Sequence, residues 1–135
     1  TSLIANVLGR QTAAERGADE ALFLRDGFAV EGAATNLFVV VGDEVRTPPH
    51  GPDLLPGVTR DLVVELLRGA GMPCEERPVP AAMLEGAQEI WITSSTKDVV
   101  PVTRLDGRAV GDGVPGPVWR RVHALFQTWR ETQGP

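Results

Sequence analysis

The spacing of apolar residues predicts short strands and amphipathic helices in a mixed order. Near the start, Leu3, Ile4, Val7 and Leu8 recur at helical spacing, so we expect an amphipathic helix over residues 3–16 that ends at Gly17. Two apolar runs around the turn signal at residues 26–27 predict a β-hairpin. The next run, residues 37–41, is typical of a buried strand.

The remaining pattern continues this mixture of strands and helices. A proline-rich stretch, residues 47–56, excludes a helix until Gly57 introduces one. The predicted elements are strands at 21–24, 28–30, 37–41, 45–47, 75–77, 89–93 and 99–105, and further helices at 59–69, 81–84 and 117–131. The sequence therefore predicts a mixed α and β (α/β) fold, and its length fits one domain, residues 1–135.

Composition excludes several classes of function. The net charge of −5 and the scattered arginines argue against nucleic-acid binding. The longest apolar run has five residues, far short of a membrane-spanning helix. The single cysteine, Cys74, allows no internal disulfide and no Cys/His metal site, which favours a reducing cytoplasm. Twelve arginines accompany one lysine, so Schiff-base chemistry within this chain would have to use Lys97.

Three segments have the residue types of an anion-binding or cofactor-binding site. Residues 57–60 begin the second predicted helix, where free N–H groups and the helix dipole favour phosphate, although Thr59 would also serve as a simple N-cap. Residues 93–96 place four hydroxyl side chains after a strand, which fits an anion site or a polar turn. Glu31 precedes a run of small residues with room for a flat ligand, or is an exposed loop residue.

The spacing of these segments resembles the signature of the class IV aminotransferases, the fold type IV enzymes that use pyridoxal 5'-phosphate (PLP). The matching segments are EGAATNLF at 31–38, VRT at 45–47 and LPGVTR at 55–60, followed by EIWITSSTKDVVPV at 89–102 and LDGRAVGDGVPGPV at 105–118. The N-terminal part looks closest to the D-amino acid and branched-chain aminotransferase branches. The resemblance implies the C-terminal domain of that fold, with a mixed sheet partly curled into a barrel and flanked by helices.

The resemblance also implies roles for individual residues. Glu31 matches the carboxylate that contacts the pyridine nitrogen and keeps it protonated, so that the ring serves as an electron sink. Leu55 matches the residue that packs on the ring, and Asn36 matches the signature asparagine, with either a cofactor or a loop-shaping role. The implied phosphate and pocket positions are Gly57, Val58, Thr59, Ser94, Ser95 and Thr96. Ala33 and Ala34 stand where many relatives carry hydroxyl residues.

The family's reactive lysine has no counterpart in this chain. The resemblance places it about two residues before Thr1, so no catalytic residue is expected within residues 1–135. Lys97 follows the hydroxyl-rich segment, but the family carries a small residue there, and we expect a surface lysine. The N-terminal domain that holds the substrate carboxylate in relatives is likewise expected upstream.

Three functions are compatible with the resemblance. The first is the PLP-binding domain of an aminotransferase that exchanges an amino group between a D-amino or branched-chain amino acid and a 2-oxo acid, inactive as this chain alone. The others are an aminodeoxychorismate lyase domain, which performs an elimination on the same scaffold, and a non-catalytic binding or structural domain. The family builds its sites beside a homodimer interface, so the full-length protein is expected to be a homodimer. Its single cysteine favours the cytoplasm as its location.

Overall fold

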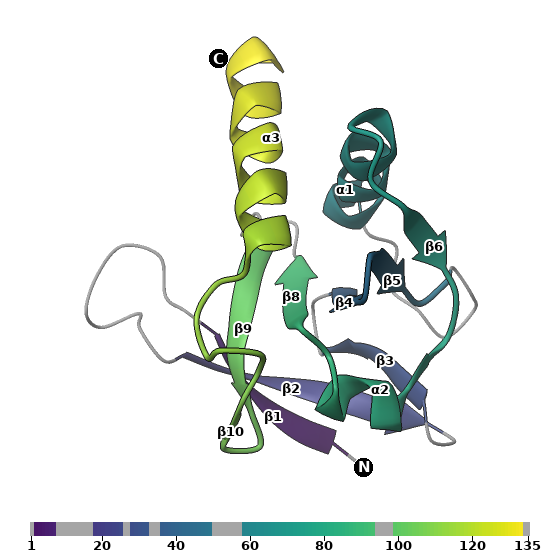
Figure 1. Ribbon diagram of the computed structural model, residues 1–135, viewed down its shortest axis with the longest axis vertical. Coiled ribbons are helices and arrows are strands. Elements are labelled where there is room, and N and C mark those ends of the chain that lie inside the picture. Colours follow the sequence, from purple (N-terminus) through teal and green to yellow (C-terminus); the bar gives the residue numbers. More distant parts are fainter. Residues whose placement is uncertain are drawn as a thin grey trace.

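The computed structural model describes residues 2–7, 18–25, 28–32, 36–49, 58–93 and 99–133 of the chain. Side chains are described for residues 36–49, 59–93 and 99–132. These segments form a single mixed sheet and three helices (Figure 1).

The sheet of the described residues contains ten strands. Nine of them follow the order β6-β5-β4-β8-β9-β1-β2-β3-β7, and β10 pairs with β9. The strands are β1 (Ser2–Val7), β2 (Ala18–Arg25), β3 (Phe28–Gly32), β4 (Asn36–Val41), β5 (Glu44–Thr47), β6 (Cys74–Glu76), β7 (Val79–Pro80), β8 (Glu89–Thr93), β9 (Val99–Leu105) and β10 (Arg108–Ala109). Only β5 and β6 pair in parallel among them, and α1 (Val58–Gly69) lies between these two strands in the chain, as parallel pairing requires.

The sheet is strongly curled but is not closed into a barrel. Its two end strands, β6 and β7, are separated by only residues 77 and 78 along the chain. The eight strand spacings between them would place the ends of a flat sheet roughly 38 Å apart, whereas the chain from Glu76 to Val79 spans about 11 Å at most. The sheet must therefore bend around its own core.

Two apolar clusters lie on opposite faces of the central strands because side chains alternate along each strand. One cluster lies inside the curl, and α2 (Ala81–Glu85) contributes to it; it contains Leu37, Val39, Val79, Leu84, Ala87, Ile90, Ile92, Val100, Val102, Leu105 and Val110. The other cluster lies beneath α1 and α3 (Pro117–Gln133) and contains Phe38, Val40, Val45, Val63, Val64, Leu67, Cys74, Trp91, Val99, Val122 and Phe126. Figure 1 shows α1 and α3 side by side over this second face.

Most of the predicted elements are confirmed. The strands of the hairpin, the buried strand at 37–41 and the helices beginning near 59, 81 and 117 all occur. Their bounds lie within two residues of the prediction, except that β2 begins three residues earlier, at Ala18. Trp91 and Cys74 are buried. The predicted turn at residues 26–27 lies outside the described residues.

The predicted N-terminal helix at residues 3–16 is wrong over its described part. Residues Ser2–Val7 form β1, which pairs with β2 on one side and β9 on the other. A strand bonded along both edges gains its stability from long-range pairing, which overrides a local helical spacing of apolar residues. Residues 8–16 lie outside the described residues.

Candidate functional site

The start of β4 and the ends of β5 and β8 meet at one edge of the sheet. Because β4 runs antiparallel to both neighbours, its start lies near the ends of β5 and β8. Asn36 pairs with Thr93, and Thr93 in turn pairs with Val99 at the start of β9. The Thr47 hydroxyl at the end of β5 donates to the carbonyl oxygen of Leu37 at 2.6 Å. We call this row of strand ends the upper edge of the sheet.

Helix α1 begins at the same upper edge. Val58 is its first residue, and Thr59 follows with a half-buried side chain. The guanidinium of Arg60, one residue further, donates to the carbonyl oxygen of Pro48 at 2.8 Å, and Pro48 directly follows β5. This contact places the first turn of α1 beside the end of β5, and with it the N–H groups that a helix N-terminus leaves for an anion.

Glu31 approaches this edge along the chain. It is the penultimate residue of β3, which ends at Gly32, and β4 begins four residues later at Asn36. Only four residues of the chain therefore separate Glu31 from Asn36, which pairs with Thr93. Its side chain lies outside the description, as do residues 33–35 between the two strands.

The other predicted site residues fall outside the described residues. These are Leu55, Gly57, Ser94, Ser95 and Thr96, together with Lys97 and the alanines at 33 and 34. Their described chain neighbours do meet: Thr93 and Val99, on either side of residues 94–98, are paired to each other at the upper edge. Of the predicted set, the structure thus brings Asn36, Val58 and Thr59 to one edge.

Thr93 has a side chain without a hydrogen-bond partner. It is 1% exposed, and its Oγ1 is one of two buried side-chain atoms in the described part of the chain that lack a partner. A buried hydroxyl that makes no hydrogen bond destabilises the fold by about 1–3 kcal/mol. A buried hydroxyl of this kind has room for a hydrogen bond to a water molecule or a ligand.

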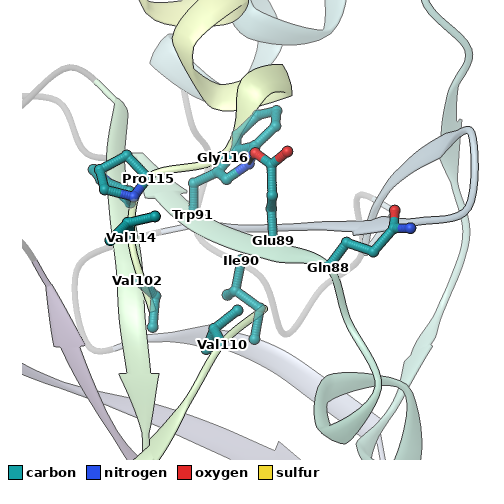
Figure 2. A pocket seen from close by; sticks show the side chains of 10 residues that line it. Gln88, Glu89, Ile90, Trp91, Val102, Val110, Val114, Pro115 and Gly116 are labelled. Carbon is teal, nitrogen blue, oxygen red and sulfur yellow. Dashed lines mark hydrogen bonds between the residues drawn. The ribbon is translucent and has the colours of Figure 1, made fainter. Parts of the chain in front are cut away.

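The sequence did not reveal the role of Glu89 at the opposite end of β8. Its carboxylate is buried and accepts the backbone N–H of Trp119 at 2.8 Å and that of Val118 at 3.0 Å, both in the first turn of α3. The Trp91 indole donates to the same carboxylate at 3.2 Å. Figure 2 shows Glu89 pointing toward the start of α3, beside Gly116. The sequence signal for this cap was a carboxylate directly before the apolar run at residues 90–92, in a strand that the structure buries completely.

Glu89 also borders a small pocket at this lower end of β8 (Figure 2). The pocket is lined by Gln88, Glu89, Ile90, Trp91, Pro101, Val102, Val110, Val114, Pro115 and Gly116. The Glu89 carboxylate is occupied by the start of α3, and Thr93 lies at the other end of the same strand. The pocket is therefore separate from the upper edge.

The remaining titratable groups near the second core give no sign of metal or thiol chemistry. Burial raises the pKa of the Cys74 thiol to about 11, so the thiol is neutral at physiological pH. No cluster of three or more His, Cys, Asp and Glu side chains suited to a metal ion occurs within the described ranges. The same ranges contain no helix that is long and apolar enough to cross a membrane.

The family model and the most similar proteins with known names point to the same family. Residues 1–105 match the family model of amino-transferase class IV. The chain is 38% identical to D-alanine aminotransferase of Bacillus licheniformis over 126 residues, which covers 93% of this chain and 44% of that protein. The chain thus spans less than half the length of this relative.

Solved structures agree in fold. Branched-chain amino acid aminotransferase of Escherichia coli superposes with a TM-score of 0.77 at 34% identity, over 81% of this chain and 36% of that one. An aminotransferase from Brucella abortus, solved with PLP bound, superposes with a TM-score of 0.71 at 36% identity, over 76% and 36% of the two chains. Sequence and fold agree, and the chain belongs to the class IV aminotransferase family.

Proposed function

We propose that residues 1–135 are the PLP-binding C-terminal domain of an amino-acid aminotransferase. In the full-length protein, an amino group would pass between a D-amino or branched-chain amino acid and a 2-oxo acid. Family membership supports this proposal, as do the names of the relatives and the PLP bound to the Brucella abortus structure. The chain alone would bind the cofactor without turning over.

The cofactor site is supported most directly by the anion-binding groups that lie along the upper edge, in the first turn of α1 and at the end of β8. The first turn of α1 offers N–H groups and the Thr59 hydroxyl, and the buried Thr93 hydroxyl at the end of β8 has no partner within the chain as described. Backbone N–H and hydroxyl donors can bind a phosphate without a basic side chain, because the dipole of the helix also stabilises the negative charge. The donor chemistry therefore fits the phosphate end of PLP.

The remaining roles come from the sequence and complete this proposal. Bound PLP supplies an electron sink for the carbon that loses a proton. Glu31 would hold a proton on the pyridine nitrogen, and Leu55 would pack on the ring. Ser94, Ser95 and Thr96 would add polar contacts, since they follow Thr93 directly, and Asn36 would shape the loop before β4.

The reactive lysine is proposed to lie just before Thr1, and Lys97 is proposed to stay outside the chemistry. We further propose that the full-length protein is a cytoplasmic homodimer, in which the N-terminal domain holds the substrate carboxylate. These proposals follow from the resemblance to the class IV aminotransferases.

The test is amino transfer by the full-length protein. The protein would be incubated with PLP, 2-oxoglutarate and either D-alanine or each branched-chain amino acid, and the new 2-oxo acid would be quantified by mass spectrometry. We expect turnover with at least one of these donors. No turnover with any of them, or elimination from aminodeoxychorismate in its place, would contradict the proposed reaction.

A further inference from the structure

Arg60 is a buried cation that joins three parts of the fold at the upper edge. Its side chain is 4% exposed. The guanidinium donates to the Pro48 carbonyl oxygen at 2.8 Å, to Asp61 Oδ1 at 2.9 Å and to Glu76 Oε1 at 2.8 Å. Pro48 follows β5, Asp61 belongs to α1 and Glu76 is the last residue of β6. One side chain therefore links both parallel strands to the first turn of the helix.

The chemistry of the guanidinium explains why arginine stands here. Its planar fork places several N–H donors in fixed directions, so it can reach a carbonyl and two carboxylates at once, which a lysine ammonium cannot do with the same geometry. A buried cation of this kind is costly unless it is paired, and here it is paired with Glu76 and Asp61. The hydrogen bond from Arg60 is the main reason why the pKa of Glu76 lies below its ordinary value.

The position of Arg60 in the helix gives these contacts a consequence for the proposed site. Arg60 directly follows Val58 and Thr59, the two residues proposed to bind the phosphate. Fixing the guanidinium to Pro48 and Glu76 fixes the first turn of α1 against the ends of β5 and β6. Donors held in place before binding lose less conformational freedom on binding, and the affinity gains accordingly.

We infer that Arg60 is a positioning residue for the cofactor phosphate. It acts by holding the first turn of α1, which contains the proposed phosphate ligands, in place. This inference rests on the proposed function of the upper edge. It concerns the phosphate alone, because Arg60 lies beside the proposed phosphate ligands. The ring contacts proposed for Glu31 and Leu55 do not depend on it.

The test compares PLP with pyridoxal, which is the same molecule without the phosphate. Dissociation constants of both would be measured by absorbance titration for the full-length protein and for Arg60→Lys. We expect the preference for PLP over pyridoxal to fall about tenfold in Arg60→Lys, while the affinity for pyridoxal changes less than about twofold. A general loss of structure would weaken both ligands alike, and that outcome would overturn the inference.

Two further variants complete the experiment. Arg68→Met removes an exposed arginine from the same helix that also contacts Glu76, at 3.4 Å, and it should leave the preference unchanged. Glu76→Gln keeps Arg60 but weakens its anchor, and should lower the preference about threefold even if Arg60→Lys does not fold. An unchanged preference for PLP over pyridoxal in Glu76→Gln overturns this inference and leaves the proposed function standing. A wild-type protein that does not distinguish PLP from pyridoxal overturns the proposed function as well.

Discussion

The indole Nε1 of Trp119 donates to the backbone carbonyl oxygen of Val99 at 2.9 Å. Trp119 lies in the first turn of α3, and Val99 is the first residue of β9. The same first turn is held by the Glu89 carboxylate in β8. Helix α3 therefore contacts both strands that flank residues 94–98, which include the proposed cofactor residues Ser94, Ser95 and Thr96.

Trp119→Phe should weaken cofactor binding slightly, because it removes this donor and keeps an aromatic ring. We expect the free energy of unfolding to fall by about 1 kcal/mol and the PLP affinity to fall about threefold. Urea unfolding followed by circular dichroism and absorbance titration measure these effects. Trp129→Phe is the matched control, since Trp129 stacks on Phe126 further along α3; an equal loss of affinity there would refute the link to Val99.

Glu89→Gln should destabilise the protein by about 2 kcal/mol, since the carboxylate accepts three hydrogen bonds in a buried setting and an amide offers one acceptor atom in place of two. The urea midpoint is the measurement. Glu85→Gln, an exposed change in α2, should stay within about 0.5 kcal/mol of the wild type. Equal effects at the two positions would contradict the capping role of Glu89.

Gly116→Ala should also be destabilising, by about 1–3 kcal/mol. A Cβ at residue 116 would overlap the Glu89 carboxylate, which cannot move away without breaking its bonds to α3. Gly86→Ala provides the control, because a Cβ there meets no atom within 4 Å and its φ of −103° suits any residue. Thermal unfolding should separate the two variants. The same melting temperature for both would show that a Cβ at residue 116 fits without displacing Glu89.

Cys74 should make stability fall at high pH. Burial raises the pKa of its thiol from the ordinary 9.0 to about 11, so the unfolded chain loses this proton first as the pH rises. Between these two pH values the folded state binds more protons than the unfolded state, and the free energy of unfolding decreases with pH. Comparison with Cys74→Ala by urea unfolding isolates this contribution. A pH dependence identical in the two proteins would exclude it.

Local patterns predicted the elements whose own residues form an apolar run or a clear apolar period. Residues 37–41 were recognised as a buried strand because every neighbour in the run is apolar, and α3 because its apolar side chains recur at helical spacing. The helix predicted for residues 3–7 is wrong because their strand depends on pairing with β9, about a hundred residues away. The strands β7 and β10 have two residues each, too few for any periodicity.

In the candidate site, too, local sequence patterns predicted some residues and long-range contacts added others. Motif spacing predicted Val58, Thr59 and Asn36 as site residues, which stays a prediction, and the structure places the three near one edge of the sheet. The contacts of Arg60 with Pro48 and Glu76 could not be read from spacing, because they join residues 12 and 16 positions away across three elements. The unpartnered hydroxyl of Thr93 is likewise a property of burial, which becomes visible only once the strands are assembled.

We propose above all that this chain holds the cofactor while the reactive lysine lies before Thr1. Borohydride reduction of the PLP-loaded full-length protein, followed by peptide mapping with mass spectrometry, locates the lysine that is bonded to the cofactor. We predict a single modified lysine immediately upstream of Thr1 and an unmodified Lys97. A modified Lys97, with no modification upstream of Thr1, would contradict the account.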